Sequence, residues 1–225
     1  MKILLCGDPH GEYWIRRCLT LADSLGIPMT VFLGDVWDVH MPYYEEYATR
    51  MLACAGNHEQ PLFWEAGKAK GRCLDDYSTF EFGGIKFGVL GHIDQDNHEH
   101  LRIHLPWLYD ALGPKPDIWM RKMPVSEAAK IFSGVDVMLT HDGPHPMEFI
   151  DPGGCMRTSG SKYLADICLT VKPKFLMHGH YHDEFTRKIG DTLAIGLDQQ
   201  SKSNEPTSMV VLDTETMAYE FVSHR

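Results

Sequence analysis

Short apolar runs alternate with polar loops along the first third of the chain. Three of these runs are nearly continuous, at residues 2–6, 29–33 and 51–55. Runs of this length and composition are typical of strands that are buried on both faces. Between the first two runs, apolar residues recur at helical spacing over residues 13–25 and stop at Gly26 and Pro28. This spacing predicts a helix.

The alternation of strand and helix continues, and this repetition predicts the first sheet. Further helices are predicted at residues 42–50 and 61–69, after the second and third strands. Three consecutive units of strand, loop and helix indicate parallel strands with helices packed on the sheet. The loops at the carboxyl ends of such strands then gather at one edge.

The pattern changes near residue 80, where a second sheet is predicted to begin. Strands at 80–82 and 85–90 flank Gly83-Gly84, which is a common hairpin turn. The later elements are predicted to be helices at 124–132 and 161–171, strands at 135–140 and 175–177, and a closing meander of strands at 184–188, 193–195, 209–212 and 217–222. Ser161 is expected to cap the second of these helices.

Two stretches carry no regular pattern. Residues 92–123 are polar and rich in histidine, and they predict a surface excursion, while the glycine-containing segment 151–161 predicts an irregular loop. Taken with the strands and helices, the pattern predicts a single domain over residues 1–225. The expected fold class is α/β, a two-sheet β-sandwich flanked by helices.

Composition and charge narrow the class of protein. Hydrophobic residues make up 44% and charged residues 23% of 225 residues, which is ordinary for a globular chain. The formal net charge of −10 argues against a nucleic-acid backbone as the main partner. Asp8 comes too early for a signal peptide, and no apolar run reaches about 18 residues. We therefore expect a cytoplasmic protein that does not enter membranes.

Metal-ligand residue types stand at the ends of the predicted strands. They are Asp8, His10, Asp35, Asn57, His58, His141, His180 and His182. Hydrolysis of a phosphoester by water is favoured by two cations about 3.5 to 4 Å apart, and one carboxylate can span such a pair. A lone Asp after a strand is often a turn residue, and a lone His is often a satisfied polar group. The joint pattern instead favours a two-metal site.

The same residues form five ordered motifs. These are Asp8-x-His10, Gly34-Asp35-x-x-Asp38, Gly56-Asn57-His58-Glu59, His141 and Gly179-His180-x-His182. The set resembles the calcineurin-like metallophosphoesterase superfamily, whose fold is the αββα sandwich. The resemblance implies that Asp35 bridges two metals, with Asp8, His10 and His182 on one and Asn57, His141 and His180 on the other. Nitrogen and oxygen ligands without thiolate suit Mn, Fe, Zn or Ni better than Ca.

The resemblance also implies how hydrolysis proceeds. A metal-bridging hydroxide attacks phosphorus, and His58 supplies a proton to the leaving alkoxide. Asp38 is expected to orient His58, although a structural cap is an equal alternative for it. His178 is either a support for the ligands or a buried, hydrogen-bonded residue. Arg157, just before a predicted helix, is a candidate phosphate contact.

Two departures from the protein-phosphatase branch refine the expected substrate. That branch carries Asp-Arg-Gly in its second motif, whereas Asp38 is followed here by Val39-His40, and it typically lacks the histidine that is present here as His182. Both differences favour a phosphodiesterase acting on a nucleotide or another small phosphodiester. The alternatives are a phosphomonoesterase or phosphoprotein phosphatase of the same superfamily and, as a minor one, a non-catalytic interaction scaffold. Such scaffolds lose metal ligands, and none of the expected ligands is missing here.

Overall fold

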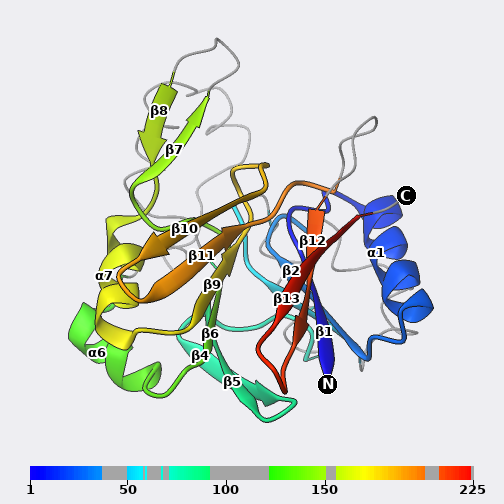
Figure 1. The fold of residues 1–225 in the computed structure, drawn as a ribbon, viewed down its shortest axis with the longest axis horizontal. Helices are drawn as coiled ribbons and strands as arrows, with labels where there is room; N and C mark the ends of the chain where they lie inside the picture. Colours follow the sequence, from blue (N-terminus) through cyan, green and yellow to red (C-terminus); the bar gives the residue numbers. More distant parts are fainter. Residues whose placement is uncertain are drawn as a thin grey trace.

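Two mixed β-sheets pack face to face, and helices cover their outer faces (Figure 1). The computed structural model describes residues 1–36, 50–57, 59, 67, 71–91, 122–150, 156–200 and 208–223. This architecture confirms the α/β fold class expected from the sequence, a two-sheet sandwich flanked by helices. Among the described residues, no helix has the length and apolarity needed to span a membrane.

The first sheet contains the amino-terminal strands. Its strands, in spatial order, are β13 (Tyr219–Ser223), β12 (Ser208–Asp213), β1 (Lys2–Cys6), β2 (Met29–Leu33) and β3 (Met51–Cys54). The last three run parallel, as predicted, and β12 pairs antiparallel with β1. Helix α1 (Glu12–Ser24) buries Ile15, Cys18, Leu19 and Ala22 on the outer side of this sheet.

The second sheet contains most of the later strands. Its strands, in order, are β10 (Phe185–Ile189), β11 (Thr192–Gly196), β9 (Phe175–His178), β6 (Val137–Thr140), β5 (Ile85–Leu90) and β4 (Ser78–Phe82). Helices α6 (Val125–Ile131) and α7 (Lys162–Val171) cover its outer face. Ser161 caps α7 as predicted, because its Oγ accepts a hydrogen bond from the Leu164 amide at 3.1 Å.

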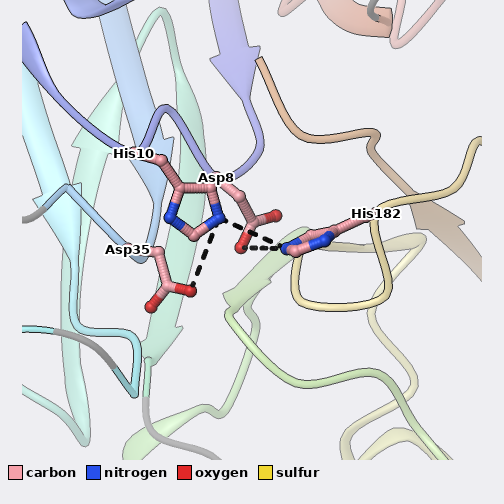
Figure 2. Close-up of side chains that lie close together, drawn as sticks. All are labelled: Asp8, His10, Asp35 and His182. Atoms are coloured by element: carbon pink, nitrogen blue, oxygen red, sulfur yellow. Dashed lines mark hydrogen bonds and ion pairs between the residues drawn. The ribbon is translucent and has the colours of Figure 1, made fainter. Parts of the chain in front are cut away.

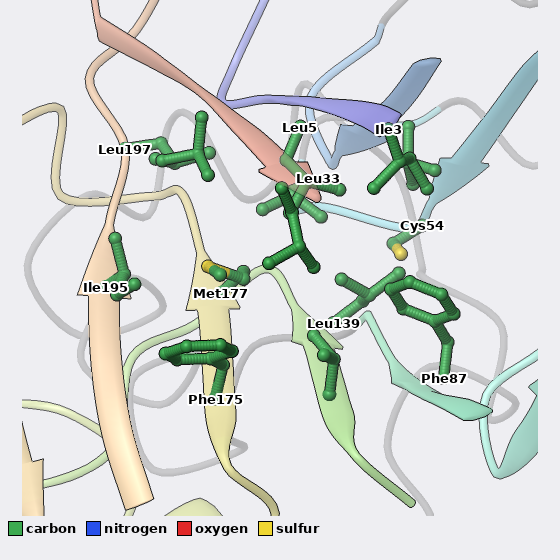
Figure 3. Close-up of a cluster of buried hydrophobic side chains, with 14 of the residues drawn as sticks. Ile3, Leu5, Leu33, Cys54, Phe87, Leu139, Phe175, Met177, Ile195 and Leu197 are labelled. Atoms are coloured by element: carbon green, nitrogen blue, oxygen red, sulfur yellow. The ribbon is translucent and has the colours of Figure 1, made fainter. Parts of the chain in front are cut away.

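The space between the sheets is filled by alternate residues of their strands (Figure 3). Ile3 and Leu5 of β1 point into this layer, where Leu139 and Met177 reach it from the opposite sheet. The intervening residue Leu4 packs instead beneath α1. Because β1 is buried on both faces, it reads as a continuous apolar run and not as an alternating one. The polar residues that follow such a strand are held in place because the strand is packed on both of its faces.

Two expectations about the later strands were wrong. The closing strands do not form one meander, because β10 and β11 join the second sheet while β12 and β13 return to the first. The segment 151–161 is not wholly irregular: β8 (Met156–Ser159) pairs with β7 (Met147–Ile150) in a separate two-stranded sheet (Figure 1). The hairpin is stabilised by backbone pairing between strands of only four residues. Strands this short do not show the long apolar alternation by which a strand is predicted from sequence. Most of the predicted helix at 42–50, of the predicted helix at 61–69 and of the excursion at 92–123 lies outside the described residues.

Candidate metal centre

Four side chains from three loops converge at the carboxyl ends of the strands (Figure 2). Asp8 and His10 follow β1, Asp35 follows β2, and His182 follows β9. One ligand atom of each residue lies within 4.8 Å of those of the others. The two carboxylates are buried, whereas the two imidazoles are partly exposed. This arrangement of oxygen and nitrogen donors is a candidate metal-binding cluster.

Asp8 is held in an environment that favours a bound cation. Burial raises the pKa of its carboxyl well above the usual value, the hydrogen bond from the His180 amide opposes that rise, and the negative charges of Glu59 and Asp198 add to it. The His180 amide lies 3.1 Å and 2.9 Å from the two carboxylate oxygens. A divalent cation at the cluster would offset both the desolvation and the repulsion. The donor set therefore fits a metal.

Asp35 connects this cluster to a second group of side chains. Its Oδ2 lies 4.0 Å from His10 Nε2, while its Oδ1 lies 3.4 Å from His141 Nε2. His141 Nε2 is also 2.8 Å from Asn57 Oδ1, and the rings of His141 and His180 are 5.0 Å apart. The two oxygens of one buried carboxylate thus face two separate sets of donors.

The protonation of His141 follows from its contacts. Its Nδ1 lies 3.6 Å from Asp8 Oδ1 and 2.7 Å from the Leu33 carbonyl oxygen, which can only accept a proton from it. In the neutral ring the proton therefore sits on Nδ1, and the lone pair of Nε2 faces the oxygens of Asn57 and Asp35. Three electron-rich atoms that converge in this way are the donors a cation requires.

Four residues of the two groups have a left-handed backbone. The φ angles are 48° at His10, 53° at Asp35, 69° at His180 and 53° at His182. Residues other than glycine rarely adopt this conformation, which costs about 1–3 kcal/mol at each position. Strained backbone of this kind concentrates at functional sites, and here it aims side chains from separate loops at one point.

The glycine of the third motif allows the loops to approach one another. A Cβ placed on Gly56 would lie 2.3 Å from Asp35 Oδ1 and 2.4 Å from the Asp35 amide nitrogen. No side chain fits there, so only glycine lets the loop after β3 pack on the residue that joins the two groups.

Glu59, the last residue of the third motif, has a role that the sequence does not predict. The buried carboxylate accepts hydrogen bonds from the Val36 amide at 2.7 Å and the Gly56 amide at 2.6 Å. It thus ties the loop of Asp35 to the loop of Asn57. Asp142 and Tyr181 form a second tie of this kind, between the loops after β6 and β9. Neither tie has a signal in the spacing of the motifs, because each depends on contact between loops.

His178 is fully buried and His180 is half-buried, and both imidazoles are neutral at pH 7. Burial lowers the pKa of each imidazole to about 4. His178 Nδ1 lies 2.9 Å from the Gly179 carbonyl oxygen, to which it donates, and its ring packs 5.2 Å from that of Phe185. These contacts are those of the buried, hydrogen-bonded alternative expected for His178.

The side chains of three predicted site residues lie outside the described part of the structure. Asp38 and His58 lie outside the described residues. Arg157 belongs to β8, but its side chain is also outside the described part of the structure. Their expected roles in proton transfer and phosphate contact remain predictions.

Comparisons with known proteins identify the family of this chain. A profile of the calcineurin-like phosphoesterases matches residues 1–184, a range that holds all five motifs. An uncharacterized protein of Haemophilus influenzae is 22% identical over 210 residues, which are 82% of this chain and 84% of that protein.

Two solved structures share the fold. An archaeal phosphodiesterase superposes with a TM-score of 0.52 at 15% identity, over 100% of both chains. GAP50 of Plasmodium superposes with a TM-score of 0.56 at 10% identity, over 99% of this chain and 84% of GAP50. At such identities the likeness is one of fold alone, whereas the profile match extends over most of the sequence. The chain belongs to the calcineurin-like phosphoesterase family, which comprises metal-dependent hydrolases of phosphoester bonds.

Proposed function

We propose that the protein is a phosphodiesterase that uses two divalent metal ions. The observation that carries this proposal is the position of Asp35, whose two oxygens face His10 on one side and His141 on the other. In the proposed site, Asp35 is shared by both metals. Asp8, His10 and His182 complete the first metal, and Asn57, His141 and His180 complete the second.

The ligands and their neighbours would divide the chemistry. Two cations held by these residues would lower the pKa of water for attack on phosphorus near neutral pH and would neutralise charge on the phosphoryl group. The Leu33 carbonyl keeps the proton of His141 on Nδ1 and so keeps Nε2 available as a ligand. His58 is proposed to donate a proton to the leaving alkoxide, with Asp38 as its orienting partner. Arg157 is proposed to contact the phosphate.

The sequence favours a diester substrate over a monoester. Val39-His40 follows Asp38 where protein phosphatases of the superfamily carry an arginine, and His182 is present. An archaeal phosphodiesterase with this fold is consistent with the assignment. The proposed substrate class is a nucleotide or another small phosphodiester, with Mn, Fe, Zn or Ni as the metals.

Turnover of two model substrates tests the proposal. Purified protein is stripped with EDTA, supplied with each of the four metals, and assayed on bis-p-nitrophenyl phosphate and p-nitrophenyl phosphate. We expect faster hydrolysis of the diester, and two metal ions per chain by elemental analysis. Asp35→Asn should abolish activity and weaken the binding of both metals, and His58→Ala should lower kcat while metal content is kept. Asp191→Asn, on an exposed turn, is the matched control for a lost carboxylate.

The other outcomes separate the alternatives. Preference for the monoester would assign the protein to the phosphomonoesterases. GAP50, which shares the fold, is described as the anchor in the inner membrane complex of Plasmodium. Protein that binds no divalent metal and hydrolyses neither substrate would support a scaffold of that general kind, and full activity in Asp35→Asn would disprove the proposed site.

A further inference from the structure

A hydrogen bond between Tyr181 and Asp142 joins two of the loops that carry proposed histidine ligands, the loops after β9 and β6. The phenolic hydroxyl donates to Asp142 Oδ1 at 2.9 Å. Tyr181 lies between His180 and His182, after β9, and Asp142 directly follows His141, after β6. One side-chain contact therefore connects three of the proposed ligands through their chain neighbours.

Asp142 is well suited to fix the tyrosine. Its side chain is buried, and the same Oδ1 accepts the Gly143 amide at 2.8 Å. The phenolic oxygen also contacts Ser159 Oγ in β8, at 3.3 Å. Because the phenol has one proton, and that proton goes to the closer partner, Asp142, Ser159 acts as the donor to the phenolic oxygen.

The turn that carries Tyr181 has a conformation that requires such a restraint. Both His180 and His182 have positive φ, at 69° and 53°. The Tyr181 amide donates to the Gly179 carbonyl at 2.8 Å, and its ring packs edge-on against His180, with centroids 5.1 Å apart. Backbone strain of this kind persists only where the surroundings hold it. The Gly179 amide donates to the His141 carbonyl at 3.2 Å, and the Tyr181 side chain adds a second link between this turn and the neighbouring strand end.

We propose that Tyr181 is a positioning residue that, through Asp142, sets His180 and His182 at the angles needed to bind their metals. This inference rests on the proposed function, in which the two histidines belong to different metals. Groups that orient metal ligands typically contribute 10- to 100-fold to metal affinity or activity. Tyr181 differs from most of them because it would affect both metals from one position between their ligands.

Manganese affinity measured by calorimetry on EDTA-stripped protein tests this inference. Tyr181→Phe keeps the ring packing and removes only the hydroxyl. We expect the dissociation constants of both sites to rise, by about tenfold or more. Tyr219→Phe is the matched control, because Tyr219 pairs with Leu212 at the opposite end of the sheet and packs on Phe175 through its ring. A purely structural hydroxyl would lower the unfolding free energy of the stripped protein and leave the dissociation constants unchanged.

A double-mutant cycle isolates the hydrogen bond. If Tyr181 acts through Asp142, then Asp142→Ala weakens binding as Tyr181→Phe does, and the double variant is no weaker than Asp142→Ala alone. Losses that multiply in the double variant would overturn the inference. Asp142→Asn keeps an acceptor for both donors, so it should retain more affinity than Asp142→Ala. If Tyr181→Phe does not fold, the comparison of Asp142→Asn with Asp142→Ala tests the inference in its place. Equal losses of manganese affinity in these two variants would count against the inference.

The inference and the function on which it rests fail in different ways. If wild-type protein binds no manganese, both the inference and the proposed function are wrong. If wild-type protein binds two ions and the Tyr181→Phe variant binds them equally well, only the role of Tyr181 is wrong.

Discussion

Gly179 packs directly against the carboxylate of Asp8. A Cβ on Gly179 would lie 2.3 Å from Asp8 Oδ2, so the Asp8 carboxylate, which is fully buried, would have to shift. The glycine that opens the last histidine motif is therefore needed for space next to a proposed ligand from the first motif.

Substitution of this glycine should disrupt both stability and metal binding. We expect Gly179→Ala to lower the unfolding free energy by about 1–3 kcal/mol, the usual cost of overpacking a buried site, and to weaken manganese binding because Asp8 must shift. Urea denaturation in EDTA and a manganese titration measure the two effects. Gly134→Ala is the control: its Cβ would meet nothing within 4 Å, although its φ of 70° carries a strain cost. Manganese binding should be unchanged in the control and impaired in Gly179→Ala.

Removal of one carboxylate oxygen at Glu59 should separate two ligand loops. In Glu59→Gln one amide N–H of Val36 or Gly56 faces an NH₂ group in place of an acceptor, and an unsatisfied buried donor costs about 1–3 kcal/mol. The loss is measured by urea denaturation in EDTA. The same substitution at Glu81, exposed on β4, should change stability by no more than about 0.5 kcal/mol. Equal stability of the two variants would show that the tie between the loops contributes little.

Metal binding should stabilise the folded protein. Manganese at 100 times the dissociation constant of one site adds about 2.7 kcal/mol to the unfolding free energy, because the cation offsets the burial and repulsion of the Asp8 carboxylate. Thermal unfolding with manganese and with EDTA measures the gain. Asp35→Asn should lose most of it. A rise of the same size in this variant would mean that manganese binds elsewhere on the chain.

Acid should destabilise the metal-free protein through His178. Its pKa is about 4 in the folded protein against 6.5 ordinarily, because burial disfavours the charged ring. Between these values the unfolded chain binds a proton that the folded one does not, so stability is full above the unfolded value and falls as the pH drops toward 4. At pH 5 this amounts to about 2 kcal/mol relative to pH 7.

The measurement compares urea denaturation of wild-type protein and His178→Gln in EDTA at pH 7 and pH 5. The contribution of His180 has the same direction in both proteins, so the difference between them reports on His178. We expect the variant to lose less stability on acidification than wild-type protein does. Parallel losses would contradict the lowered pKa.

Much of the fold could be predicted because its signals are local. The continuous apolar runs at β1, β2 and β3 mark strands buried on both faces, and Ser161 marks the start of α7 by its own capping chemistry. The types and order of the metal-ligand residues are also properties of the sequence itself. The family match over residues 1–184 agrees with that part of the prediction.

Sheet membership and the ties between loops could not be predicted in the same way. The strands β10 and β12 have similar lengths and hairpin turns, yet β12 pairs with β1, with Lys2 opposite Asp213. The local periodicity of a strand does not show whether it pairs with a strand about two hundred residues away or with the next strand in the sequence. Either pairing requires only that the strand has an apolar face. The hairpin of β7 and β8 was missed for a related reason, since its backbone pairs outside both large sheets.

The sequence by itself determined which residues can bind metal and which segments form strands, because residue chemistry and apolar spacing are written along the chain. The tertiary structure decided that the oxygens of Asp35 face two imidazoles, that Glu59 holds two loops together, and that Tyr181 reaches Asp142. These relationships arise only when loops from different strands meet at one edge, where packing and buried hydrogen bonds fix their geometry.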